Sequence, residues 1–132
     1  MNDPSGLSGV TYDAGALIAA ERDSMAVWRL HRRLLEHGMY PTLPAVVLGQ
    51  AWRGGPQARL SRLIRGSLVE PFTEQQARAA GAALAASGSS DLVDAAVVVA
   101  ALAREDLVVT SDPDDLRRIA SALGRELAVH VV

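Results

Sequence analysis

A strand-like run that ends at an acid and a proline stands near the C-terminus, at Leu107-Val108-Val109-Thr110-Ser111-Asp112-Pro113. Four apolar or β-branched residues in a row predict a short strand buried on both faces, and proline is typical of the first residue of a helix. The same arrangement occurs near the N-terminus, where Val10-Thr11-Tyr12 precede Asp13 and a helical pattern over residues 14–21. An aspartate therefore follows each of two predicted strands.

Strand and helix patterns alternate along the whole chain. We expect strands at residues 10–12, 40–43, 67–71, 107–110 and 127–132, and helices at 14–21, 25–36, 44–52, 57–65, 73–86, 91–104 and 113–123. Short apolar strands separated by helices predict a parallel sheet that is covered and buried on both faces. No linker, repeat or low-complexity segment interrupts the pattern, so residues 1–132 are expected to form a single α/β domain.

Composition narrows the chemistry of any metal site. The chain has 132 residues, 49% of them hydrophobic, and no cysteine, which excludes disulfides and thiolate ligands. Its three histidines show no zinc-ligand spacing, so a bound metal needs oxygen ligands, which favours magnesium or manganese. Residues 1–6 lack a signal-peptide pattern, and no apolar stretch reaches 18 residues. A soluble, cytoplasmic protein without a membrane span is the simplest expectation.

The basic charge is concentrated in one segment. All 13 basic residues are arginine, and residues 53–65 carry four of them and no acid: Arg53, Arg59, Arg62 and Arg65. The planar guanidinium suits phosphate, so this segment is a candidate contact for RNA or for an acidic partner. Arginines on a helix also form an ordinary solvated face, and the two interpretations have about even weight.

Five aspartates are candidates for one shared site. Ligands of parallel sheets bind beyond the C-terminal ends of the strands, where Asp13 and Asp112 are expected. Helix starts rise from the same edge, which adds Asp91 and Asp94, and Asp115 follows Asp112. Converging carboxylates repel one another, and a hard cation relieves that repulsion. Taken one at a time, however, each acid is more simply an N-cap or first-turn residue of a helix.

Other polar and aromatic residues near these segments admit simpler interpretations. Ser111 and Thr110 are candidates to hydrogen-bond a carboxylate or a phosphate, or they form a simple turn. The two tryptophans, at 28 and 52, are expected in the core or in an interface. Glu21 and Asp23 are expected to be solvated charges at a helix end.

Four segments, taken in order, resemble the conserved segments of PIN-domain ribonucleases: residues 10–19, 44–55, 91–96 and 110–116. Their order, their spacing and the chain length are similar to those of VapC-type toxins of toxin–antitoxin pairs, over nearly the whole chain. The resemblance implies a three-layer α/β/α sandwich with a short parallel sheet. It also implies a homodimer, RNA as substrate, and an antitoxin whose tail occludes the acidic pocket.

The resemblance also assigns roles to the acids. Asp13 and Asp94 would be the main ligands of one or two magnesium or manganese ions, which activate water to cut an RNA phosphodiester. Asp112 would complete the site. Asp91 and Asp115 would bind water molecules or serve as outer-shell ligands of the metal.

Gln50 departs from the family pattern, which has a glutamate at this position. Glutamine keeps an oxygen acceptor but has no charge and cannot act as a base. The alternative function is therefore a binding module that keeps the fold and has weak or no nuclease activity. A third class, a phosphatase or receiver-like domain, is disfavoured because receiver domains need a lysine and this chain has none.

Overall fold

Seven helices and five strands make up the part of the chain that the computed structural model describes, residues 9–132. In chain order they are β1 (Val10–Tyr12), α1 (Ala14–Glu21), α2 (Met25–Glu36), β2 (Thr42–Pro44), α3 (Ala45–Ala51), α4 (Ala58–Arg65), β3 (Leu68–Glu70), α5 (Glu74–Ser87), α6 (Leu92–Arg104), β4 (Leu107–Thr110), α7 (Pro113–Ala122) and β5 (Val129–Val131). The polar stretch at residues 1–6 lies outside the described residues.

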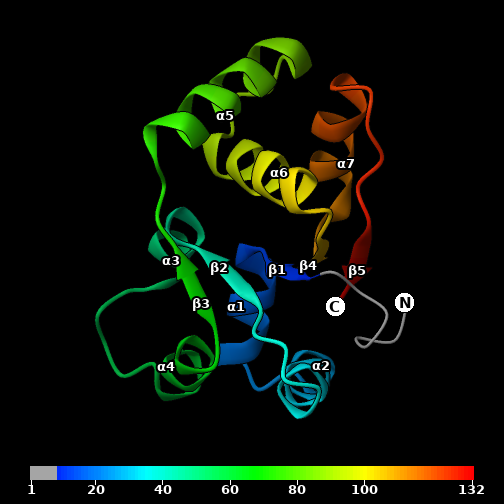
Figure 1. The fold of residues 1–132 in the computed structure, drawn as a ribbon. Coiled ribbons are helices and arrows are strands. Elements are labelled where there is room, and N and C mark those ends of the chain that lie inside the picture. Colours follow the sequence, from blue (N-terminus) through cyan, green and yellow to red (C-terminus); the bar gives the residue numbers. More distant parts are fainter. Residues whose placement is uncertain (1–8) are drawn as a thin grey trace.

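The strands form one parallel sheet in the order β3-β2-β1-β4-β5. Helices α5, α6 and α7 pack together on one side of it, and α1, α2 and α4 lie on the other (Figure 1). The expected α/β fold is confirmed, and its layers are those of a three-layer α/β/α sandwich. Because all strands run the same way, the segments after β1 and β4 leave the sheet at the same edge.

The core is built around β1, β4 and α6. Every residue of β1 and β4 is buried, and seven residues of α6 are buried as well. Alanines on α5 and α6 (Ala80, Ala83, Ala95 and Ala96) are buried between these two helices and the sheet. Small side chains let the helices approach closely, which is how a core with few aromatic residues reaches normal packing density.

The expectation that every strand is buried on both faces is wrong for the two edge strands, β3 and β5; in β5, Val131 is 52% exposed. Leu68 is 59% exposed and Val69 is 44% exposed. Strand β3 lies at an edge of the sheet, where one side has no neighbouring strand. The apolar run in the sequence is the same as in a central strand, so position in the sheet decides the exposure.

Several element boundaries and caps also differ from expectation. Strand β2 begins at Thr42 and includes Pro44, whose backbone is extended, so α3 starts one residue later than expected. Thr73 forms the expected capping box with Gln76 at the start of α5, whereas Ser24 makes no side-chain cap on α2. Glu21 is not a solvated charge: its carboxylate accepts a hydrogen bond from the Leu60 amide at 2.7 Å and so caps α4 from a distant part of the chain.

No single helix among residues 9–132 combines the length and apolar character of a membrane span. The pair α5 and α6, bent by 110° at their junction, reaches that length and composition only when counted together.

A buried polar network ties the end of α6 to the sheet. Arg104 Nε donates to Asp106 Oδ2 at 2.9 Å, Arg104 Nη2 donates to Thr11 Oγ1 at 3.0 Å, and Arg104 also pairs with Glu70. Thr11 Oγ1 in turn donates to Asp106 Oδ2 at 2.8 Å. Asp106 and Thr11 are buried, and a Cβ at Gly9 would lie 2.4 Å from Asp106 Oδ1. No local sequence pattern predicts this network, because Thr11 and Glu70 are far along the chain from Arg104 and Asp106.

We expect Arg104→Ala to lower the free energy of unfolding by about 3 kcal/mol, because it leaves the Asp106 carboxylate buried without its cation. Urea denaturation monitored by circular dichroism measures the change. Arg78→Ala is the matched control, since its ion pair with Glu74 is exposed and should contribute under about 1 kcal/mol. Equal losses in the two variants would contradict a structural role for the network.

Candidate metal centre

Asp13 is a buried carboxylate at the end of the central strand. It directly follows β1 and lies beside β4, where its backbone amide donates to the Val109 carbonyl at 3.0 Å. Thr110 Oγ1 donates to Asp13 Oδ2 at 2.8 Å. Asp13 occupies the N-cap position of α1 but makes no side-chain cap hydrogen bond. The simple capping interpretation therefore does not describe Asp13; its carboxylate is held by the neighbouring strand.

Thr110 connects Asp13 to Asp112. Its hydroxyl donates to the Asp13 carboxylate and accepts from the Asp112 backbone amide at 3.1 Å. Asp112 stands at the N-cap position of α7, and it too makes no side-chain cap hydrogen bond. The exposed Asp112 carboxylate is therefore free to take another role at the edge where β1 and β4 end.

The turn after β4 packs tightly on the start of α1. A Cβ at Gly15 would lie 2.1 Å from Ser111 Oγ and 2.8 Å from the Ser111 amide nitrogen. Only glycine fits there, so the close approach keeps the segments that carry Asp13 and Asp112 side by side. Ser111 thus packs against α1, and Thr110 is the residue that hydrogen-bonds the carboxylate.

Asp91 and Asp94 come from the start of α6. The Asp91 carboxylate accepts a hydrogen bond from the Asp94 amide at 3.0 Å, which confirms the capping interpretation for this residue. The Asp94 side chain is half-buried one turn further along. Burial is the main cause that raises the pKa of Asp94 to about 7, followed by the charges of Asp91, Asp13, Asp115 and Asp112.

The other four predicted acids therefore all act electrostatically on Asp94. Burial is also the main cause that raises the pKa of Asp13, and Asp91 and Asp112 raise it further, while the Thr110 hydroxyl and the Ala14 amide oppose the shift. Asp115 is exposed and pairs with Arg118 at 3.1 Å. Three segments, of which the first is at least 78 residues from the other two in sequence, thus place their carboxylates at one edge of the sheet.

The donor chemistry at this edge fits a hard divalent cation. Carboxylate oxygens are the preferred ligands of magnesium and manganese, and the mutual repulsion of these acids is what a cation relieves. Among residues 9–132, no three acid or histidine side chains are yet arranged closely enough to hold an ion. Asp112 and Asp115 are exposed, so their side chains can change rotamer at little cost, whereas Thr110 holds Asp13 and the Asp94 amide holds Asp91.

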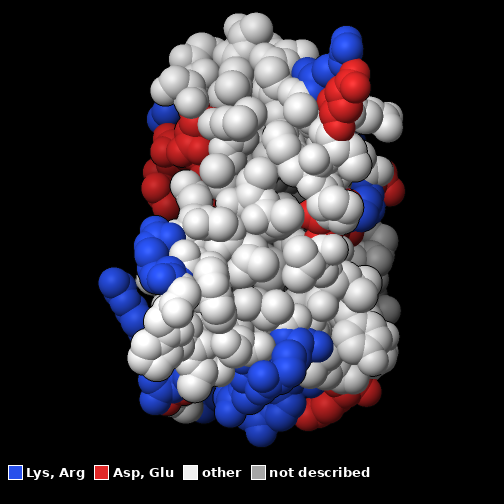
Figure 2. Space-filling view, turned by 90° about the vertical axis from the view of Figure 1, so that its left-hand side faces the viewer, with Lys and Arg blue, Asp and Glu red and all other residues white. Residues whose placement is uncertain are grey.

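Neither Gln50 nor any of the four arginines of residues 53–65 is among the groups that shift the pKa of Asp13 or Asp94. Gln50 is exposed in the last turn of α3, and it is uncharged. Arg53 donates to the Trp52 carbonyl at 2.8 Å, Arg59 pairs with Asp23 at 3.5 Å, and Arg65 is exposed. Basic side chains gather at the lower end of the face in Figure 2, the height at which α2 and α4 lie in Figure 1; one acidic patch lies beside them and the other acidic side chains lie higher up.

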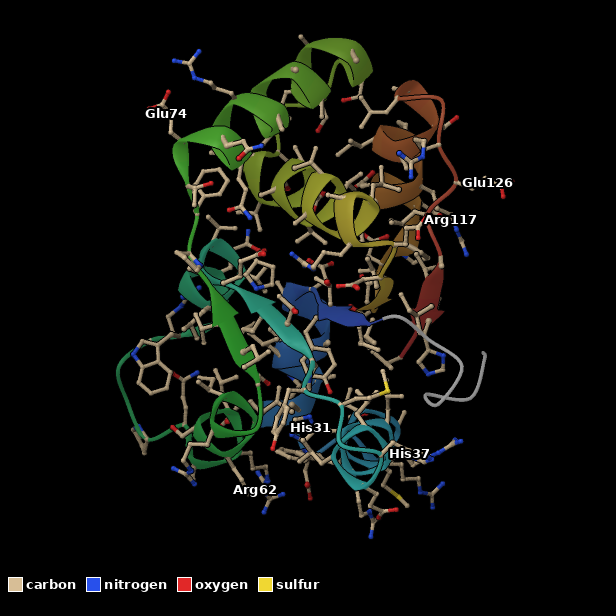
Figure 3. All side chains as sticks on the ribbon, viewed as in Figure 1. His31, His37, Arg62, Glu74, Arg117 and Glu126 are labelled. Atoms are coloured by element: carbon tan, nitrogen blue, oxygen red, sulfur yellow. The ribbon has the colours of Figure 1, made fainter. Side chains whose placement is uncertain are left out.

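A cavity of about 450 Å³ lies beside these arginines, between α2 and α4. Arg62 stacks over the Trp28 ring at 4.2 Å from its centroid, and Trp28 donates to the Ala20 carbonyl at 3.0 Å. His31 at the base of the cavity is hydrogen-bonded to the Tyr12 hydroxyl at 2.8 Å (Figure 3). Burial and the charge of Arg62 lower the pKa of His31 to about 4, so the imidazole is neutral. Trp28 packs on the core as expected, whereas Trp52 is 41% exposed.

We expect the metal-free protein to lose stability as pH rises from about 4 to about 7. Asp94 titrates near pH 7 in the fold and near pH 4 in an unfolded chain, so the folded state binds more protons over this interval and its free energy of unfolding falls with rising pH. Asp94→Asn should flatten this part of the profile. Melting temperatures in EDTA across pH 4–8 measure the effect.

Asp114→Asn is the matched control. Asp114 lies next to Asp115 in the first turn of α7, but it is not among the charges that act on Asp94. Magnesium at pH 7.5 should raise the melting temperature of the wild type more than that of Asp94→Asn. Identical pH profiles for the wild type and both variants would contradict the electrostatic coupling.

Comparisons with known proteins leave the site to be argued from its own chemistry. No family model matches this chain, and no curated protein matches it in sequence. The features of this chain that bear on function are the five carboxylates and the strands and helix starts that carry them.

Proposed function

We propose that this protein is a magnesium- or manganese-dependent endoribonuclease that acts as the toxin of a toxin–antitoxin pair. The observation that carries the proposal is the group of five acids at one sheet edge: the Asp94 carboxyl is half-buried there, and burial together with the charges of the other four acids raises its pKa to about 7. Aspartates that serve only as helix N-caps have no physical reason to lie at the same edge of the sheet. The four segments that resemble PIN-domain ribonucleases supply RNA as the substrate class.

Asp13, Asp94 and Asp112 hold the cation in this proposal. Asp13 is the fixed member, because it is buried and receives the Thr110 hydroxyl. Asp94 and Asp112 approach it from α6 and from the end of β4. A bound divalent cation would offset the negative charge that develops on a phosphodiester and promote ionisation of an attacking water. Asp91 and Asp115 orient water or the other carboxylates from the periphery.

Two partners belong to the same proposal. An antitoxin protein would present acidic and apolar residues to the surface formed by α2 and α4, where Arg32 and Arg62 flank the cavity that contains Trp28 and Leu35. Its tail would reach the acidic cluster. Two copies of the toxin would form a homodimer, as the resemblance implies.

The second candidate function is a binding module without turnover, and Gln50 favours it. A neutral amide at this position reduces the negative charge available to a cation and supplies no base. The acids at 13, 91, 94, 112 and 115 still provide an excess of negative charge, which is why we place the nuclease first.

The nuclease proposal predicts RNA cleavage that depends on both the metal and the acids. Wild type should cut a fluorescently labelled single-stranded RNA with magnesium or manganese and not with EDTA. Asp13→Asn and Asp94→Asn should each slow cleavage by about 100-fold or more, because each removes a charged ligand. Asp114→Asn is the control and should cleave normally. Undiminished cleavage in both ligand variants would exclude the assigned site.

The role of Gln50 predicts a gain of activity. Gln50→Glu should raise the rate of metal-dependent RNA cleavage by about tenfold, since a carboxylate binds the cation more tightly. Gln75→Glu, on exposed α5, makes the same charge change away from the site and should have no effect. Cleavage that appears only in Gln50→Glu would favour the binding module, and an unchanged rate would show that Gln50 lies outside the site.

A further inference from the structure

A polar pocket lies along α7, away from the cavity between α2 and α4. It measures about 310 Å³ and is lined by Arg117, Ser121, Arg125, Glu126 and Leu127. Arg117 and Ser121 are four residues apart and therefore share one face of the helix. Gly124 has a positive φ of 71°, which turns the chain back after α7 so that Arg125 joins the same pocket. Buried Leu127 supplies an apolar contact. We call this site the α7 pocket.

The guanidinium N–H groups of the two arginines in the α7 pocket are available as hydrogen-bond donors. Within residues 9–132, the side chains of Arg117 and Arg125 make no ion pair or hydrogen bond. Arg59, Arg78 and Arg118, by contrast, are paired with acids. Guanidinium groups without partners, exposed on either side of a hydroxyl, can each bind a phosphate through two parallel hydrogen bonds. Figure 3 shows Arg117 and Glu126 on the same side of the molecule, on α7 and on the segment that follows it.

The α7 pocket is on the helix that begins at the acidic cluster. Asp112 is the N-cap of α7, and the charges of Asp112 and Asp115 reach Asp94. At about 1.5 Å per residue, Arg117 lies about 7 Å along the helix axis from Asp112, and Ser121 lies about 6 Å further. Arg117 is two residues after Asp115 and so about 200° around the helix from it. An RNA strand that contacts both the acidic cluster and the α7 pocket would therefore cross over α7, and it would meet Arg117 before the rest of the pocket.

We infer that the α7 pocket binds phosphate groups of the RNA backbone on one side of the bond that is cut. This inference rests on the proposed ribonuclease function and adds a location for the substrate. Arg117 and Arg125 supply positive charge, and the Ser121 hydroxyl supplies a neutral donor. Contacts of this kind position a strand without reading its bases. The Glu126 carboxylate at the same pocket repels phosphate and limits the affinity.

The test is RNA binding in EDTA, which separates binding from cleavage. Fluorescence anisotropy with a labelled single-stranded RNA at several salt concentrations measures both affinity and its salt dependence. The double variant Arg117→Ala/Arg125→Ala should bind about tenfold or more weakly. The slope of log K against log salt should fall by about 0.7 for each lost phosphate contact, or about 1.4 for the pair.

Two further variants make the test specific. Arg22→Ala/Arg29→Ala removes the same charge from the region of α1 and α2, where no RNA contact is proposed, and should bind RNA nearly as well as the wild type. Glu126→Gln removes the opposing charge and should bind RNA up to about fivefold more tightly. All of these side chains are exposed, and circular dichroism verifies that each variant is folded.

Three results would overturn the inference: no RNA binding by the wild type, unchanged binding in Arg117→Ala/Arg125→Ala, or equal loss in the two double variants. The last would mean that total charge, and not the α7 pocket, attracts the RNA. The proposed nuclease is judged separately, by metal-dependent cleavage in the wild type. If the wild type shows no metal-dependent cleavage but its RNA binding still depends on Arg117 and Arg125, the proposed nuclease activity is rejected and RNA binding by the α7 pocket is supported.

Discussion

The candidate site depends on one buried carboxylate. Asp13 ends the central strand, receives the Thr110 hydroxyl from β4, and has a raised pKa because it is removed from water. A buried acid in this position is costly unless something compensates it. The hydroxyl of Thr110 supplies part of that compensation, and a bound cation would supply the rest. The pairing of β1 with β4 is thus also what holds the core of the acidic cluster together.

The arginines of this protein fall into groups with different physical roles. Arg104 is tied into the Thr11–Asp106–Glu70 network and serves the fold. Arg62 covers the Trp28 ring beside a cavity. Arg117 and Arg125 make no such internal contacts in the described part of the chain. The same guanidinium group is therefore a structural cation, an aromatic contact or an exposed hydrogen-bond donor according to what surrounds it.

The aspartates show which of their roles can be predicted from their position at a helix start and which cannot. Asp91 is an N-cap, as its sequence position suggests, yet its charge also acts on Asp94. Asp13 and Asp112 occupy N-cap positions without capping. The Asp13 carboxylate instead accepts a hydrogen bond from Thr110, and the Asp112 carboxylate is exposed at the edge of the sheet. A cap and a metal ligand have the same sequence signature, because both are short acids at the start of a helix.

The order of strands and helices, the parallel sheet and the shared edge of the acids all followed from the sequence by itself. Apolar runs and helix signals are local, and parallel strands must end at one edge. Only the tertiary structure decided that β3 is exposed, that Glu21 caps α4, and that Arg104 joins Thr11, Asp106 and Glu70. It also decided that Arg117 and Arg125 share a pocket. These features depend on contacts between residues distant in sequence, and no local pattern encodes which side chains will meet.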